Sequence, residues 1–121
     1  MTDSNTSPQI DIHLDRIILG ELSSLLEDDF PDLIETFLSD AQLRLRELVK
    51  TVNSGVAEDI RQSAHSFKGS SSNVGARRLS SLCRELEEMT RSGQIAGAQG
   101  LVDRIEIELP KVDALMRKTY L

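Results

Sequence analysis

Apolar residues recur at every third or fourth position through almost the whole of this 121-residue sequence, and this period constrains the fold most strongly. Such spacing places apolar side chains along one face of an α-helix. Long alternation of β-branched residues is absent from the sequence, as are the Asn-Gly and Asp-Gly pairs that mark tight hairpins. The sequence therefore predicts an all-α fold.

Glycine, proline and short polar stretches divide the periodic pattern into predicted helices. Pro31 suits a first helical turn, where its missing N–H has no partner. Asn53-Ser54-Gly55, Gly75 and Ser92-Gly93 are typical helix ends. Because the connections are short, consecutive long helices should be antiparallel neighbours. We expect an up-down four-helix bundle with a short additional N-terminal helix as a lid. The predicted helices are Leu14–Leu26, Pro31–Val52, Ala57–Val74, Ala76–Arg91 and Ala98–Lys118.

Composition narrows the class of protein. The polar residues 1–9 are typical of a disordered tail, which leaves 10–121 as one domain. A net charge of −6 and few aromatic side chains argue against binding to nucleic acid. The single cysteine, Cys83, excludes an internal disulfide and a multi-cysteine zinc site, and we expect no metal. No apolar run approaches the roughly 20 residues that span a bilayer. We therefore expect a cytoplasmic protein without a membrane partner.

The segment Ala64–Ala76 combines poor helix formers with an intact helical period. Gly69 inside a helix costs roughly 1 kcal/mol relative to alanine, and three serines follow it. Phe67, Ser71 and Val74 nevertheless keep the apolar spacing. If the helix continues, packing must offset its poor propensity. A weak sequence inside a packed helix often marks a functional compromise.

His65 is the chemically reactive side chain of this segment. At about 100° per residue, the apolar stripe centres roughly 140° from His65, so the imidazole should face solvent. Lys68 and Gly69 lie on either side of it, one turn further on, and Arg61 and Ser72 share its face. An unprotonated imidazole is a good nucleophile near neutral pH. The Lys68 ammonium suits the charge of a phosphoryl group, and Gly69 leaves room for a second protein.

The sequence lacks the parts of a kinase. It contains no Gly-rich nucleotide loop, no lysine-bearing phosphate motif and no acidic metal cluster. We therefore predict a phosphocarrier that is not an enzyme and has no cofactor of its own. The phosphoryl group, and any Mg²⁺, should arrive with the partner.

The motif resembles a known family. The run His65-x-x-Lys68-Gly69-Ser70-Ser71 is followed by Gly75-Ala76 and then by Leu79, Leu82, Cys83 and Leu86. This pattern resembles the histidine-containing phosphotransfer (HPt) domains of bacterial and fungal phosphorelays. Glu27–Leu33 is similar to the start of that family's second helix, and the likeness spans Leu14 to Met116. With no kinase or receiver sequence attached, the chain is most similar to the free-standing bacterial type.

The resemblance implies a role for each residue of the site. His65 would accept a phosphoryl group from the receiver-domain aspartate of a hybrid sensor histidine kinase and pass it to the receiver domain of a response regulator. Lys68 would stabilise that group, Gly69 would admit the receiver, and Glu87 on the following helix would hydrogen-bond the imidazole. Family receivers dock on an apolar patch beside the histidine, for which the candidates here are Leu14, Ile17 and Ile18.

Other interpretations stay open at this point. The alternative hypothesis is a non-catalytic helical adaptor that binds a partner through an apolar patch. Glu87 is equally consistent with a solvated charge. A metalloenzyme has little support, because His13 and His65 are far apart and no carboxylates bracket them at ligand spacing. We interpret His13 as incidental, and we expect a monomer because partners need the exposed face.

Overall fold

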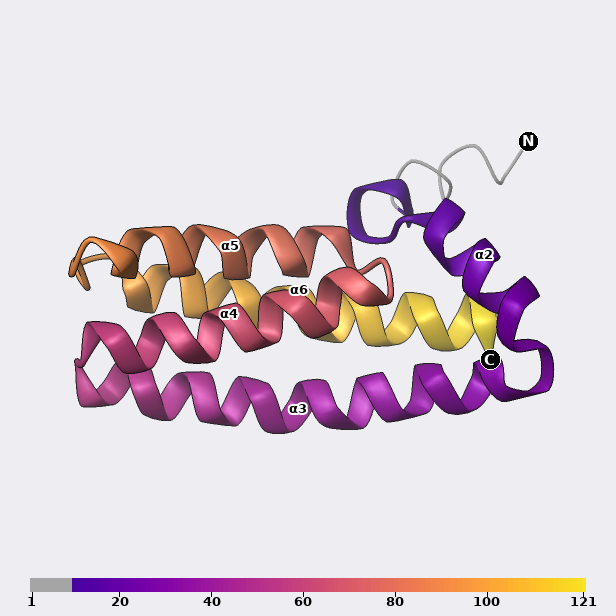
Figure 1. Ribbon diagram of the computed structural model, residues 1–121, viewed down its shortest axis with the longest axis horizontal. Coiled ribbons are helices and arrows are strands. Elements are labelled where there is room, and N and C mark those ends of the chain that lie inside the picture. The colour runs from indigo at the N-terminus through magenta and orange to yellow at the C-terminus, as the bar shows by residue number, and fades with distance from the viewer. Residues whose placement is uncertain (1–9) are drawn as a thin grey trace.

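The structure is a computed structural model that describes residues 10–121 (Figure 1). Residues 1–9, the predicted disordered tail, lie outside the described residues. No strand occurs between residues 10 and 121, and the all-α prediction is confirmed. A short helical segment at 10–13 precedes the other elements. These are α2 (Arg16–Leu26), the 3-10 turn η1 (Glu27–Asp29), α3 (Phe30–Ser54), α4 (Ala57–Asn73), α5 (Arg77–Arg91) and α6 (Ala98–Tyr120).

The four long helices form the predicted up-down bundle. Each of α3, α4 and α5 packs against the next helix in the chain, and α6 closes the bundle against α3. Figure 1 shows that successive long helices run in opposite directions, while α2 lies across one end, near the C-terminus and the α4–α5 turn. Within residues 10–121, no helix combines the length and apolarity that a membrane crossing requires.

The first helix begins later than predicted. Asp15 caps α2, because its Oδ1 accepts hydrogen bonds from the backbone N–H groups of Ile17 (3.0 Å) and Ile18 (3.2 Å). Leu14 therefore precedes α2, and its side chain is completely buried in the core. The observed start lies two residues after the predicted one, because the period of a short apolar stretch does not locate a capping residue.

Helix α4 runs without a break through Gly69 and the serines that follow it. Phe67 and Ser71 are buried within the bundle, and Val74 at the end of α4 is buried as well. Burial of a side chain as large as Phe67 contributes about 1.5–3 kcal/mol, which exceeds the roughly 1 kcal/mol that a helical glycine costs. Packing therefore keeps α4 helical where propensity alone would end it. Cys83 lies in the same core, where burial raises the pKa of its thiol to about 12.

The α4–α5 turn fits closely against the chain before α2. Gly75 has a φ of 76°, in the left-handed region, and its carbonyl oxygen accepts a 2.7 Å hydrogen bond from the backbone N–H of Asp15. A Cβ at Gly75 would lie 3.0 Å from the Asp15 carbonyl oxygen. The carboxylate of Asp15 also lies 3.2 Å from Arg77 at the start of α5. The bundle and α2 are thus joined at this turn.

Two glycine substitutions should have opposite effects on stability. Gly75→Ala places a side chain in a left-handed conformation and against Asp15, so we expect the free energy of unfolding to fall by about 1–3 kcal/mol. Gly69→Ala adds a methyl group with no atom within 4 Å, so stability should rise by up to about 1 kcal/mol. Urea unfolding followed by circular dichroism measures both. Equal midpoints for the two variants would contradict this account of the turn.

Candidate functional site

The imidazole of His65 projects from the middle of α4 into solvent. Its side chain is 63% exposed, while the neighbouring Ala64 and Phe67 are buried and fix the orientation of the helix. Helical periodicity predicts that His65 lies opposite the apolar stripe, and in the structure it lies on the exposed face of α4. A reactive nitrogen on this ring is therefore accessible to another protein.

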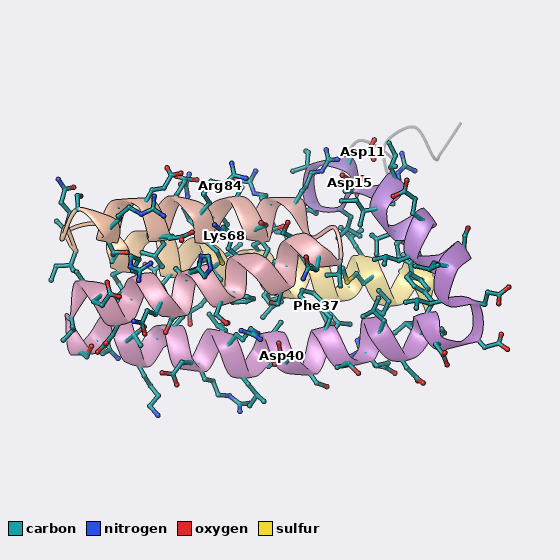
Figure 2. The ribbon with its side chains drawn as sticks, viewed as in Figure 1. Asp11, Asp15, Phe37, Asp40, Lys68 and Arg84 are labelled. Carbon is teal, nitrogen blue, oxygen red and sulfur yellow. The ribbon has the colours of Figure 1, made fainter. Side chains whose placement is uncertain are left out.

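A buried carboxylate on α5 holds the imidazole in place. Glu87 is only 3% exposed, and its Oε2 lies 2.7 Å from His65 Nδ1. Its Oε1 lies 2.7 Å from the Nζ of Lys68, a side chain that is 28% exposed. Figure 2 shows Lys68 between α4 and α5, in line with this contact. The Glu87 carboxylate thus binds both predicted residues of the motif, His65 through Oε2 and Lys68 through Oε1.

The charge of Glu87 determines which histidine nitrogen can react. Burial by itself raises the pKa of Glu87, but the hydrogen bonds and charges of Lys68 and His65 outweigh burial, and the pKa lies below its ordinary value. Glu87 is therefore ionised at neutral pH, and an ionised carboxylate can only accept hydrogen bonds. His65 Nδ1 must then donate its proton to Glu87. In the neutral ring, the lone pair is on Nε2.

Gly69 leaves an opening beside the imidazole. A Cβ built at this position would meet no atom within 4 Å, so no packing contact requires glycine there. Glycine is nevertheless the residue of lowest helix propensity in the interior of α4, and it lies one turn from His65. This opening lets another molecule approach the ring closely.

Arginines surround the site in two different arrangements. Arg61, one turn before His65, is held by Glu58, with its Nη2 2.6 Å from the Glu58 carboxylate. Arg91, one turn after Glu87, reaches toward that carboxylate, with 3.4 Å between Nη2 and Oε2. Arg91 is not among the residues predicted for the site, although its spacing of four residues from Glu87 is typical of an ion pair along a helix. Ser72 is exposed on α4, as its position on the His65 face predicts.

The three residues predicted for docking have different environments. Leu14 is 0% exposed, so it cannot contact a partner, and its assignment to the docking patch was wrong. Ile18 is half-buried against the α4–α5 turn. Ile17 is 75% exposed on α2, and Leu25 is similarly exposed further along that helix. Because α2 packs on the bundle through Leu19, its outward face carries Ile17 and Leu25.

The interpretation of His13 as incidental was also wrong. Its Nδ1 lies 2.6 Å from Oε2 of Glu108 on α6, and the two side chains are 13% and 3% exposed. No local sequence signal joins these residues, because 95 positions separate them. No group of three or more His, Cys, Asp or Glu within residues 10–121 is arranged to hold a metal ion.

The low pKa of Glu87 should make part of the stability depend on pH. A carboxyl group with a lowered pKa in the folded state stabilises the fold above its unfolded pKa, near 4.5, and loses this contribution as the pH falls through the folded pKa. The stability advantage of the wild type over Glu87→Gln should therefore shrink below about pH 4.5. Urea unfolding at a series of pH values tests this, with Glu88→Gln on the exposed side of α5 as the charge control. A constant difference would show that the pKa of Glu87 is the same in the folded and unfolded states, so that its contacts with His65 and Lys68 do not favour the ionised form.

Comparisons with known proteins agree with this geometry. The Hpt domain model matches residues 32–115. Histidine-containing phosphotransfer protein B (HptB) from Pseudomonas aeruginosa PAO1 is 42% identical, with a TM-score of 0.85 over 88% of this chain and 92% of that one. A putative histidine-containing phosphotransfer protein from rice, 16% identical, shares the fold with a TM-score of 0.77 over 87% of this chain and 77% of that one.

A curated plant protein is similar as well. Histidine-containing phosphotransfer protein 2 of Arabidopsis thaliana is 30% identical over 95 residues, which cover 73% of this chain. The match spans 61% of the length of the Arabidopsis protein. The family model matches most of the chain, and the bacterial structure is similar over nearly its whole length. The chain therefore belongs to the Hpt domain family.

Proposed function

We propose that this protein is a phosphocarrier of a phosphorelay, in which His65 Nε2 accepts a phosphoryl group from one receiver domain and delivers it to another. The donor is the phosphoaspartate of a hybrid sensor kinase, and the acceptor is the receiver domain of a response regulator. The observation that carries the proposal is the exposed imidazole whose Nδ1 is bound by the buried carboxylate of Glu87. Membership of the Hpt domain family supports it.

The bond changes of the transfer step involve the nitrogen lone pair and a phosphorylated partner in line with it. The Nε2 lone pair attacks the phosphorus, an N–P bond forms, and the P–O bond to the receiver aspartate breaks, so that the aspartate leaves as a carboxylate. In the second transfer the same bond changes run in reverse. The N–P bond breaks, and the phosphoryl group passes to the aspartate of the second receiver. The proton stays on Nδ1, so the phosphorylated ring carries a positive charge beside Glu87.

Glu87 and Lys68 stabilise opposite charges in this step, Glu87 the positive charge on the imidazole and Lys68 the negative charge on the phosphoryl group. The Glu87 carboxylate, bound to Nδ1, stabilises the positive charge that develops on the ring and holds Nε2 toward solvent. The Lys68 ammonium, one turn from His65, stabilises the negative phosphoryl oxygens. Lys68 can leave Glu87 for the phosphoryl group without leaving that carboxylate unpaired, because Arg91 also reaches it.

The surface around His65 suits an acidic partner. Arg61 and Lys68 lie one turn to either side of His65 on α4, and Arg84 and Arg91 lie one turn to either side of Glu87 on α5. These cations gather on a chain whose net charge is −6. A receiver presents carboxylates around its phosphoaspartate, and we propose that it also supplies the Mg²⁺ of the reaction. The exposed Ile17 on α2 would extend the contact surface.

The adaptor alternative explains less of the structure. Exposed Ile17 and Leu25 on α2 would serve an adaptor equally well. A buried glutamate that holds an exposed histidine and a lysine would have no role in it. Burial of a carboxylate is unfavourable unless charged partners compensate, so this arrangement is better explained by chemistry at His65.

Substitution of His65 should abolish phosphorylation without unfolding the protein. Lys68 and Arg91 still pair with Glu87 when the imidazole is removed, so His65→Gln should keep the fold and lower the free energy of unfolding by no more than about 3 kcal/mol. The wild type should acquire acid-labile, alkali-stable label from phosphorylated receivers and from phosphoramidate, a small-molecule phosphodonor. The His65→Gln variant should acquire none, whereas the control Ser72→Ala, on the same face of α4, should be labelled fully. Label on the Gln variant would assign the chemistry to another residue.

Removal of the Lys68 ammonium should slow transfer. We expect Lys68→Ala to transfer about 10- to 100-fold more slowly, because a hydrogen bond to a charged group contributes roughly 1.5–3 kcal/mol. Lys68→Arg should recover part of the rate, since a guanidinium also binds phosphoryl oxygens. Stopped-time transfer assays with one receiver measure the rates, with Lys50→Ala on the exposed side of α3 as control. Equal rates for the two alanine variants would remove Lys68 from the mechanism.

A further inference from the structure

A second histidine–glutamate pair lies outside the candidate site. His13, in the helical segment before α2, is bound through Nδ1 to Oε2 of Glu108 at 2.6 Å. The other oxygen of Glu108 lies 3.5 Å from Nε of Arg78, at the start of α5. We call these three residues the N-terminal clamp, because they join the N-terminal segment to α5 and α6. The proposed phosphotransfer step uses none of them.

Because Glu108 is buried, its carboxylate depends on the other two residues of the clamp as partners. Its side chain is 3% exposed, and the adjacent Leu109 and the nearby Ile105 on α6 are buried core residues. A buried carboxylate is costly without a charged or hydrogen-bonding partner. His13 and Arg78 are the partners that the structure provides within residues 10–121. Removal of the imidazole would leave Glu108 with the longer contact to Arg78 alone.

The position of α2 depends on the segment that the clamp holds. Only Leu19 of the 11 residues in α2 is fully buried, so the helix has few core contacts of its own. Its start is fixed instead by Asp15, which caps α2 and whose N–H binds the carbonyl of Gly75. Between His13 and Asp15 lies the buried Leu14. The clamp therefore anchors the chain two residues before the cap that begins α2.

The start of α2 lies within reach of a partner bound at His65. Gly75 follows His65 by ten residues, which is about 15 Å along a helix. A stable interface buries about 800 Å² on each partner, a patch roughly 30 Å across. Asp15, Ile17 and Arg77 line a shallow surface hollow beside Gly75. Arg77 also lies on the face of α5 that carries Arg84 and Arg91, so this hollow is continuous with the surface around the site, although Asp11 and Asp15 balance the charges of its arginines.

We propose that His13 is a positioning residue for receiver docking, and that it acts through the N-terminal clamp by holding α2 and Ile17 beside the His65 face. This inference rests on the proposed phosphocarrier function. It assigns His13 no contact with the phosphoryl group. Loss of the clamp should weaken recognition of the receiver and leave the chemistry at His65 intact.

The test compares His13→Ala with His13→Asn. The asparagine amide nitrogen can take the position of Nδ1 and keep the bond to Glu108, whereas alanine cannot. We expect His13→Ala to raise the KM for a phosphorylated receiver about fivefold or more, at an unchanged kcat, because only docking energy is lost. His13→Asn should behave like the wild type. Asp103→Ala, which breaks the exposed 2.8 Å hydrogen bond from Gln99 on α6 and lies outside the hollow, is the control and should have no effect.

Two further measurements distinguish a failure of this proposal from a failure of the proposed phosphocarrier function. Hydrogen exchange should show faster exchange for amides of α2 in His13→Ala, with α4 to α6 protected as in the wild type. Labelling of His65 by phosphoramidate should be equal in all variants. Unchanged exchange in α2, or an unchanged KM, would overturn the clamp as a docking device. A wild-type protein that phosphoramidate does not label would instead overturn the proposed function.

Discussion

The buried carboxylate of Glu87 is the interaction on which the site depends. A carboxylate that is 3% exposed is tolerated only with partners, and here the nearest partners are the two proposed site residues of α4, His65 and Lys68, with Arg91 further away. The same contacts join α4 to α5, fix the ring so that Nδ1 carries the proton, and keep Lys68 near the imidazole. The packing of α4 on α5 and the proposed chemistry therefore depend on the same two oxygen atoms.

Helix α4 shows a compromise between stability and access. Its buried face, with Phe67 and Ala64, contributes more than enough to keep the helix intact. Its exposed face carries Gly69, which no packing contact requires and which lowers helix stability. A methyl group would fit there in the isolated protein. The packing of this chain therefore does not account for glycine at this position, whereas the proposed close approach of a receiver domain to His65 does.

Much of this structure could be predicted from the spacing of apolar residues, and the failures have physical causes. The long helices have many apolar positions each, so their period located each helix, with ends within two residues of those observed, and identified the face that carries His65. The short α2 does not, and its start is set by the side chain of Asp15. Leu14 was assigned to the surface because apolarity alone does not distinguish a docking residue from a core residue. Burial of Glu87 was equally hidden, since a charged residue next to a leucine stripe is usually solvated.

The two histidines show why the type of contact does not by itself define a reactive site. Both bind a buried glutamate through Nδ1, at 2.7 Å for His65 and 2.6 Å for His13, and each glutamate also has a cationic partner. Exposure separates them, because His65 is 63% exposed and His13 only 13%. In the first case, the bond to glutamate leaves Nε2 on the open side of a helix, available to a partner. In the second case, the same bond holds a segment of chain in place. A local motif of histidine, lysine and glycine predicts the first arrangement, whereas the second depends on residues that only the folded chain brings together.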